Sequence, residues 1–128
     1  MGRFFLVCLG GAVGTGARYA IGNLVLALPA AAGFPWHTLA VNVIGSFALS
    51  FLGHVGLATE FVSPTARAVL ATGVLGGFTT YSSFNYETLG LFEQGATILA
   101  ALNLVGTVFG CLLAGLLGAA AARALVGP

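Results

Sequence analysis

The chain has 128 residues, of which only four are basic and three acidic, while 59% are hydrophobic and the mean hydropathy is +1.06. A soluble domain carries roughly a quarter charged residues, so this composition excludes a soluble enzyme and indicates lipid as the solvent. The formal net charge of +1 provides no basic surface, which excludes nucleic acid as a partner. We therefore expect an all-α membrane protein surrounded by the lipid bilayer.

Long charge-free stretches predict four transmembrane helices, because a helix needs about 20 apolar residues to cross the hydrocarbon core. The expected spans are residues 4–28, 36–58, 66–92 and 96–123. Segment 29–35 divides the longest apolar stretch, since its two prolines and one glycine disfavour a continuous helix. The spans form one domain over residues 1–128 and leave little chain outside the bilayer, so the function must lie within it.

Glycines four residues apart place two small residues on one helical face, which lets membrane helices approach closely. The sequence has such pairs at Gly10 and Gly14, Gly73 and Gly77, and Gly106 and Gly110. We expect these faces to pack against other helices.

Arg18 lies about ten residues before the end of the first span, too deep for a loop residue. It either extends its side chain to the membrane interface or concentrates anions at a water-filled entrance.

The second span carries a stripe of polar residues at i+4 spacing: Thr38, Asn42, Ser46 and Ser50. Hydroxyls in membrane helices often serve only as interhelical hydrogen-bond partners, and that interpretation remains open here. An amide is more expensive to bury unless its donor and its acceptor both find partners. We therefore expect Asn42 to face a wet cavity, a bound ion or another polar helix. The two histidines, His37 and His54, are expected at the membrane interfaces.

The third span has paired glycines followed by five polar or amphipathic residues, Thr79, Thr80, Tyr81, Ser82 and Ser83, near its centre. Glycines tolerate non-helical backbone, which survives at membrane depth only where protein buries it or where it lines a cavity. The pattern predicts a break near residues 76–80. Such a break exposes carbonyls that can hold a cation and amides that can attract an anion. A helix that is only kinked is the alternative.

Tyr81, Phe84 and Glu87 follow each other at i+3 spacing and share a face if the helix resumes after the break. Aromatic ring edges are electropositive, so two rings can contact an anion without the fixed charge that would trap it. The alternative is that the two rings only pack in a helix interface. We expect Glu87 to be a structural hydrogen-bonding residue without a proton-relay role, because no second titrating group is evident near it.

The fourth span repeats the polar spacing with Asn103, Thr107 and Cys111. Two polar tracks without a carboxylate or an ammonium suit small neutral or anionic species. One chain with four spans is too small to enclose a wide pore, so the pathway is expected to be narrow and built between subunits.

Three motifs, in this order, resemble those of the Fluc fluoride channels, also called CrcB. They are GGAVGTGARY at 10–19, TLAVNVIGSF at 38–47 and GGFTTYSSF at 76–84 with Glu87. The resemblance covers essentially the whole chain. It implies a small bacterial inner-membrane protein that forms an antiparallel, dual-topology homodimer. It also implies passive, selective export of fluoride through two narrow pores, which lowers the cytoplasmic fluoride concentration.

Motif positions assign roles by this resemblance. Asn42 corresponds to a pore-lining amide, while Tyr81 and Phe84 occupy the two positions of an aromatic box. Supporting pore or vestibule residues are Thr80, Ser82, Ser83 and Arg18, with Asn103 and Thr107 in the polar track of the fourth span. The backbone carbonyls of Gly76 and Thr79, from both subunits, correspond to the ligands of a structural sodium ion at the dimer centre.

The sequence departs from the family pattern at two places. Tyr81 stands where the family usually has Phe, so its hydroxyl either donates to the anion or needs another partner when buried. Leu99 and Asn103 stand where family members often have Tyr and Ser, so that part of the pathway is expected to be lined differently. Of the arginines, Arg3, Arg67 and Arg123 fall on one side and Arg18 near the other, a bias that mildly favours one orientation.

Two alternatives remain from sequence alone. A small multidrug transporter is also a four-helix dimer, but it needs a membrane-embedded carboxylate, and the first span has no Asp or Glu. A non-conducting assembly subunit would use its polar stripes only to join helices.

Overall fold

The computed structural model describes residues 1–28, 33–58 and 62–127, and all regular structure in these ranges is helical. The elements are α1 (Gly2–Leu26), α2 (Trp36–Ala58), α3 (Pro64–Ala68), the π-helix η2 (Val69–Leu75), α4 (Gly76–Phe78), α5 (Tyr81–Glu93) and α6 (Thr97–Val126). Within the described ranges, three helical segments are long and apolar enough to cross a membrane: Gly2–Leu26, Trp36–Gly56 and Thr97–Val126. The prediction of an all-α membrane protein is confirmed.

The expected third span, residues 66–92, corresponds to a run of shorter pieces. It begins with α3 at Pro64, continues through η2 and α4, and resumes as α5 up to Glu93. Ser63 caps the start by accepting a 3.2 Å hydrogen bond from the N–H of Ala66. None of these pieces alone reaches the length of a membrane span, because the backbone leaves the helix between Phe78 and Tyr81. Of the expected interruption at 29–35, residues 29–32 lie outside the described residues.

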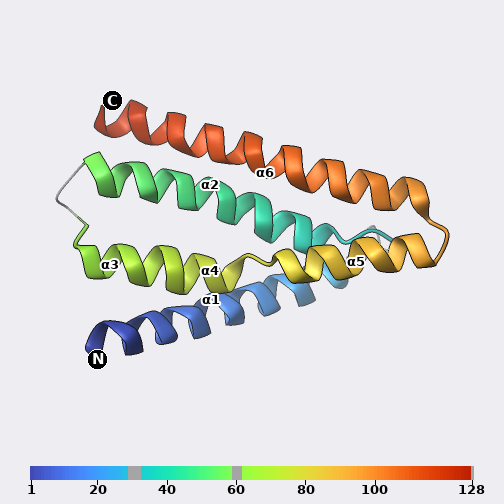
Figure 1. The fold of residues 1–128 in the computed structure, drawn as a ribbon, viewed down its shortest axis with the longest axis horizontal. Helices are drawn as coiled ribbons and strands as arrows, with labels where there is room; N and C mark the ends of the chain where they lie inside the picture. Colours follow the sequence, from blue (N-terminus) through green and yellow to red (C-terminus); the bar gives the residue numbers. More distant parts are fainter. Residues whose placement is uncertain (29–32, 59–61, 128) are drawn as a thin grey trace.

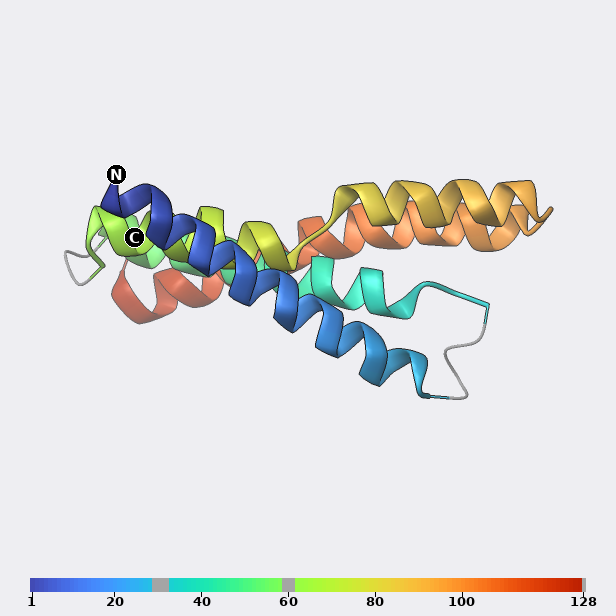
Figure 2. The same cartoon turned by 90° about the horizontal axis from the view of Figure 1, so that it is seen from below.

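The helices run side by side along the long axis, with both chain ends at the same end of the molecule (Figure 1). α2 packs along α6, α1 packs against η2 and α4, and α5 packs against α6. Figure 2 shows α1 diverging from α5 beyond the break, so that the half of the molecule farther from the termini is splayed into two pairs of helices.

Glycines account for the close contact of α1 with η2 and α4. A Cβ added at Gly10 would lie 2.9 Å from the carbonyl oxygen of Val69, and one at Gly73 would lie 3.2 Å from the Cα of Gly10. A Cβ at Gly77 would lie 2.5 Å from the carbonyl oxygen of Gly11. The expected close packing is confirmed for the first two glycine pairs. In the third pair, a Cβ at Gly110 would lie 3.4 Å from Val43 Cγ2 of α2, whereas one at Gly106 would meet no atom of the single chain within 4 Å.

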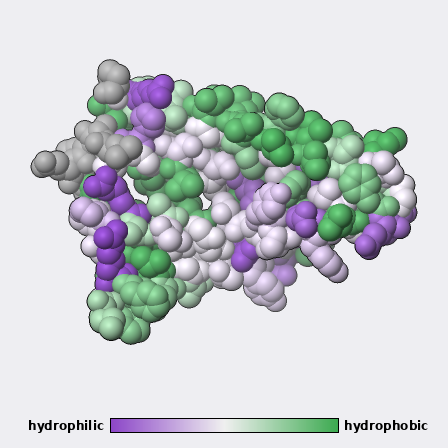
Figure 3. All heavy atoms as spheres, in the orientation of Figure 1, coloured by the Kyte–Doolittle hydropathy of each residue, from purple (hydrophilic) through white to green (hydrophobic). Residues whose placement is uncertain are grey.

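Polar side chains lie inside the molecule and large apolar ones outside. Buried polar residues are Thr38, Asn42, Thr80, Thr88, Asn103 and Thr107. Large apolar side chains are exposed along α1, α2 and α6, and the α6 side of the molecule is strongly hydrophobic (Figure 3). This distribution suits lipid outside and an interior in which polar groups satisfy one another.

Three of the four arginines lie at the end that holds the chain termini. Arg3 Nη2 donates to the carbonyl of Pro64 at 3.4 Å, Arg67 Nη1 to the carbonyl of Gly56 at 2.7 Å, and Arg123 Nε to His54 Nε2 at 3.0 Å. These contacts join neighbouring helices at one end, as the predicted grouping of Arg3, Arg67 and Arg123 requires.

Candidate functional site

The backbone is extended at two consecutive threonines between α4 and α5. Thr79 has φ −82° and ψ 158°, and Thr80 has φ −153° and ψ 111°. The predicted break is confirmed, and a helix that is only kinked is excluded. The expectation that the paired glycines supply the non-helical backbone is wrong, because Gly76 and Gly77 lie within α4. β-branched threonine is well suited to extended backbone, so it can end the helix without a glycine.

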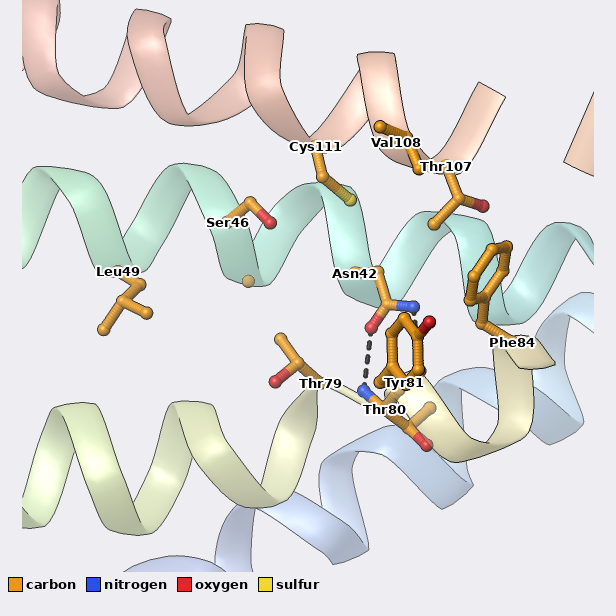
Figure 4. A pocket seen from close by; sticks show the side chains of 11 residues that line it. Asn42, Ser46, Leu49, Thr79, Thr80, Tyr81, Phe84, Thr107, Val108 and Cys111 are labelled. Carbon is orange, nitrogen blue, oxygen red and sulfur yellow. Dashed lines mark hydrogen bonds between the residues drawn. The ribbon is translucent and has the colours of Figure 1, made fainter. Parts of the chain in front are cut away.

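Asn42 of α2 holds this break open. Its Oδ1 accepts a 2.7 Å hydrogen bond from the N–H of Thr80, and its Nδ2 donates a 3.0 Å hydrogen bond to the Thr80 carbonyl (Figure 4). One side-chain amide thereby replaces both helical hydrogen bonds of a buried residue, whose peptide groups would otherwise be unsatisfied. Asn42 was expected to face a wet cavity, a bound ion or another polar helix. It borders a pocket, and both its donor and its acceptor bond to the extended backbone of Thr80.

Thr80 also caps the start of α5. Its Oγ1 accepts a 3.2 Å hydrogen bond from the N–H of Ser83 and donates a 3.0 Å hydrogen bond to Ser83 Oγ. Ser82 Oγ lies 3.3 Å from the same hydroxyl. The N–H groups of Tyr81 and Ser82 have no acceptor among the described residues, so the helix start keeps free donors. Threonine is a favoured N-cap residue, and this signal in the sequence could have located the restart of the helix at Tyr81.

A pocket of about 310 Å³ lies beside the break, between α2, α5 and α6 (Figure 4). Its lining is Asn42, Gly45, Ser46, Leu49, Thr79, Thr80, Tyr81, Phe84, Thr107, Val108 and Cys111. The two predicted polar tracks therefore meet in one pocket, through Ser46 of α2 and Thr107 of α6. The lining contains no Asp, Glu, Arg, Lys or His.

The two predicted box residues contact each other at the edge of this pocket. The ring centroids of Tyr81 and Phe84 are 5.6 Å apart and the rings are inclined by 57°. Phe84 is buried, at 5% exposure, whereas Tyr81 is 78% exposed in the single chain. The hydroxyl of Tyr81 has no hydrogen-bond partner among the described residues.

Of the polar tracks, Thr38, Ser50 and Asn103 do not line this pocket. Asn103 is fully buried, and its Nδ2 donates a 2.8 Å hydrogen bond to Thr88 Oγ1 of α5, while its Oδ1 faces Thr107 Oγ1 at 3.5 Å. Thr38 donates to Glu87 of α5 at 2.7 Å. In these contacts both residues serve as interhelical hydrogen-bond partners, the alternative that the sequence left open.

A second pocket, of about 410 Å³, lies on the α1 side of the break. Thr15, Arg18, Tyr19, Gly22, Asn23, Leu26, His37, Thr38, Val41, Thr80 and Ser83 line it. Thr80 borders both pockets, so the backbone held by Asn42 forms part of the wall between them. Arg18 therefore borders a pocket adjoining the break, as an anion entrance requires.

Glu87 is hydrogen-bonded, as expected, but it also lies close to a histidine. Its Oε1 accepts from Thr38 and lies 3.3 Å from His37 Nε2. Its Oε2 is buried without a partner among the described residues. The premise that no titrating group lies near Glu87 is wrong, because His37 folds against it from the start of α2 and does not simply face the interface. The sequence held no spacing signal for this contact, which joins residues on different helices.

The carbonyls expected to hold a sodium ion are those of Gly76 and Thr79. In an unbroken helix the Gly76 carbonyl would accept from the N–H of Thr80, but Asn42 takes that donor. Neither carbonyl has a donor among the described residues, and Gly76 is partly exposed. Uncharged backbone oxygens at a helix end fit a hard monovalent cation. The described residues contain no group of three His, Cys, Asp or Glu that could hold a metal instead.

Comparison with known proteins gives a consistent result. Residues 5–119 match the family described as "CrcB-like protein, Camphor Resistance (CrcB)". A protein of Sorangium cellulosum named "Fluoride-specific ion channel FluC" is 50% identical over 126 residues, covering 98% of each chain. Proteins with the same name from Anaeromyxobacter sp. and from Thermus thermophilus are 51% and 46% identical over 127 residues. These two matches cover 99% of this chain and all of theirs.

Proposed function

The chain belongs to the CrcB family, and on this premise we propose that it is a fluoride-selective ion channel. It exports fluoride passively across the bacterial inner membrane and lowers the cytoplasmic fluoride concentration. The observation that carries this proposal is the pocket beside the Thr79–Thr80 break, which is walled by an amide, hydroxyls and a ring pair and has no ionised lining residue.

This lining suits a small anion for physical reasons. A fixed cation in a narrow site would bind fluoride too tightly to release it, and a carboxylate would repel it. Hydroxyl donors, the second N–H of Asn42 and the positive edges of aromatic rings offer weaker, repeated contacts. The free N–H groups at the start of α5 and the Arg18 side chain draw anions toward the same region.

We propose four membrane spans, with residues 64–93 forming the broken third one at mid-membrane. The exposed face of α5 supports assembly with a second copy. Tyr81, Ser82, Asn85 and Tyr86 are exposed there in the single chain, and lipid cannot satisfy their polar groups. An antiparallel, dual-topology homodimer would cover this face on both protomers and give two equivalent pores.

The proposed pore residues are Asn42, Tyr81, Phe84, Thr80, Ser82, Ser83, Asn103, Thr107 and Arg18. The carbonyls of Gly76 and Thr79 would hold the structural sodium ion between protomers, where it would screen the partial negative charge of the two α4 ends. Sodium would thus be a structural component of the dimer.

Reconstitution tests the proposal directly. Proteoliposomes loaded with fluoride or with chloride should release fluoride selectively when a potential shunt is added, as followed with ion-selective electrodes. Replacing sodium by N-methylglucamine during purification should lower the dimer fraction in detergent. No selective fluoride release from correctly folded protein would refute the channel.

The same experiment separates the alternatives. A non-conducting assembly subunit would release neither ion. A proton-coupled multidrug transporter needs a carboxylate at its substrate site, whereas the pocket beside the break has none and Glu87 is engaged by Thr38. Transport of a cationic dye driven by a proton gradient would favour the transporter.

A further inference from the structure

His37 and Glu87 form a compact pair between α2 and α5. Glu87 Oε1 lies 3.3 Å from the ring nitrogen Nε2 of His37 and accepts the 2.7 Å hydrogen bond of Thr38. The second carboxylate oxygen is buried and unpartnered among the described residues. The Glu87 side chain is only 21% exposed, so water solvates its charge incompletely and the protonation of the adjacent histidine sets the net charge of the pair.

This pair lies beside the pocket that is the proposed anion entrance. His37 and Thr38 line the 410 Å³ pocket that Arg18 and Thr80 also border. Among the described residues, Arg18 and Tyr19 from α1 are the titratable or charged groups that line this pocket with His37, and Glu87 from α5 contacts His37 directly. Of these side chains, a histidine is the one whose charge ordinarily changes between about pH 5 and 8.

We propose that His37 is a positioning residue for anion permeation and acts through Glu87. It holds the carboxylate against Thr38 and, when protonated, neutralises its charge. When His37 is neutral, the uncompensated carboxylate repels an anion in the adjoining pocket and slows its entry. This inference rests on the proposed function, because it concerns the flux of fluoride through that pocket.

The pH dependence of fluoride flux tests the inference. Flux into and out of proteoliposomes is measured at about pH 5.5 and about pH 8, with the leak of protein-free vesicles subtracted at each pH. Wild-type flux should be roughly three- to tenfold higher at the lower pH, as expected for one added or removed charge near the path.

Two variants separate the roles of the histidine and the carboxylate. His37→Gln should conduct at the low rate at both pH values, because nothing compensates the carboxylate. Glu87→Gln should conduct faster than the wild type at both pH values and keep a dependence on pH, because the amide oxygen still accepts from Thr38 and carries no charge, while His37 still gains a proton at the lower pH. A merely structural pair would lower the flux in both variants and leave its pH profile unchanged.

The second histidine provides the matched control. His54 is the chain's other histidine, and its Nε2 accepts a hydrogen bond from Arg123 at the opposite end of α2. His54→Gln should therefore keep the wild-type pH profile. The inference is overturned if wild-type flux is independent of pH, if His37→Gln keeps the dependence, or if Glu87→Gln lowers the flux at about pH 8.

A readout independent of conduction separates this inference from the proposed function. In protein labelled with ¹⁵N histidine, Glu87→Gln should shift the ring nitrogen signals of His37 and leave those of His54 in place. Absence of fluoride flux at both pH values would refute the channel. Unchanged His37 signals would refute the pairing whether or not the protein conducts.

Discussion

Replacing Asn42 tests whether one amide holds the break in the third helical segment. Asn42→Leu keeps the branched shape of the side chain at a position that is only 8% exposed. It removes the acceptor for the Thr80 N–H and the donor for the Thr80 carbonyl, at 2.7 and 3.0 Å. Each buried peptide group left unsatisfied costs about 1–3 kcal/mol, so the variant should lose about 2–6 kcal/mol of folding free energy.

Asn42→Asp separates the structural role from the permeation role. The carboxylate still accepts from the Thr80 N–H but cannot donate to its carbonyl, so about 1–3 kcal/mol should be lost. The new negative charge in the pocket should nevertheless reduce fluoride flux more strongly than Leu does, because it repels the anion. The ratio of flux loss to stability loss should therefore be larger for Asp than for Leu.

The assay combines two measurements on the same preparations. Thermal unfolding in detergent is followed by the fluorescence of Trp36, the chain's single tryptophan, and flux is measured in proteoliposomes. Ser46→Ala is the matched control for stability, because Ser46 lines the same pocket but its side chain forms no hydrogen bond among the described residues. The reasoning fails if Asn42→Leu keeps wild-type stability and flux, or if Ser46→Ala loses as much stability as Asn42→Leu.

Three further outcomes are expected. Phe84→Leu should lower fluoride flux while costing only about 1–2 kcal/mol of stability. Tyr81→Phe keeps the ring edge and should still conduct. Equal flux in the wild type and in both variants would contradict a role for the rings. Gly14→Ala should cost about 1–3 kcal/mol in thermal unfolding because its methyl would overlap a carbonyl of η2, while Gly16→Ala, with nothing within 4 Å, should be neutral. Arg18→Gln should reduce flux more at low than at high ionic strength if the guanidinium steers anions; a salt-independent loss would indicate a packing role.

The helical layout follows from local signals that the sequence displays directly. Pro35 precedes Trp36 at the start of α2, and Pro64 occupies the first turn of α3, where its missing N–H costs nothing. The length of the apolar stretches identified the spans, since a chain in lipid must form its backbone hydrogen bonds internally, as a helix does. The π-helix η2 was not predicted, because its sequence differs in no simple way from that of an α-helix.

The position of the break was predicted within a few residues, but the residues responsible for it were not. Glycine tolerates non-helical backbone, so the break was attributed to Gly76 and Gly77. What opens the chain at Thr80 is an amide 38 residues away, and that contact depends on the rotation and offset of α2. The pairing of His37 with Glu87 escaped prediction for the same reason, since 50 positions separate the two residues along the chain.

Asn42 and Asn103 show what decides the role of a buried amide. Both stand in apolar helices with hydroxyl residues at i+4, and sequence alone gives them equal claims on a pore. Asn103 faces Thr88 within the regular helix α5, and its partner is the hydroxyl of that side chain. Asn42 faces the one place where the helix is broken and receives both a peptide donor and a peptide acceptor. The opposing backbone, more than the amide itself, therefore determines which asparagine holds the break and which bonds to a side chain of the neighbouring helix.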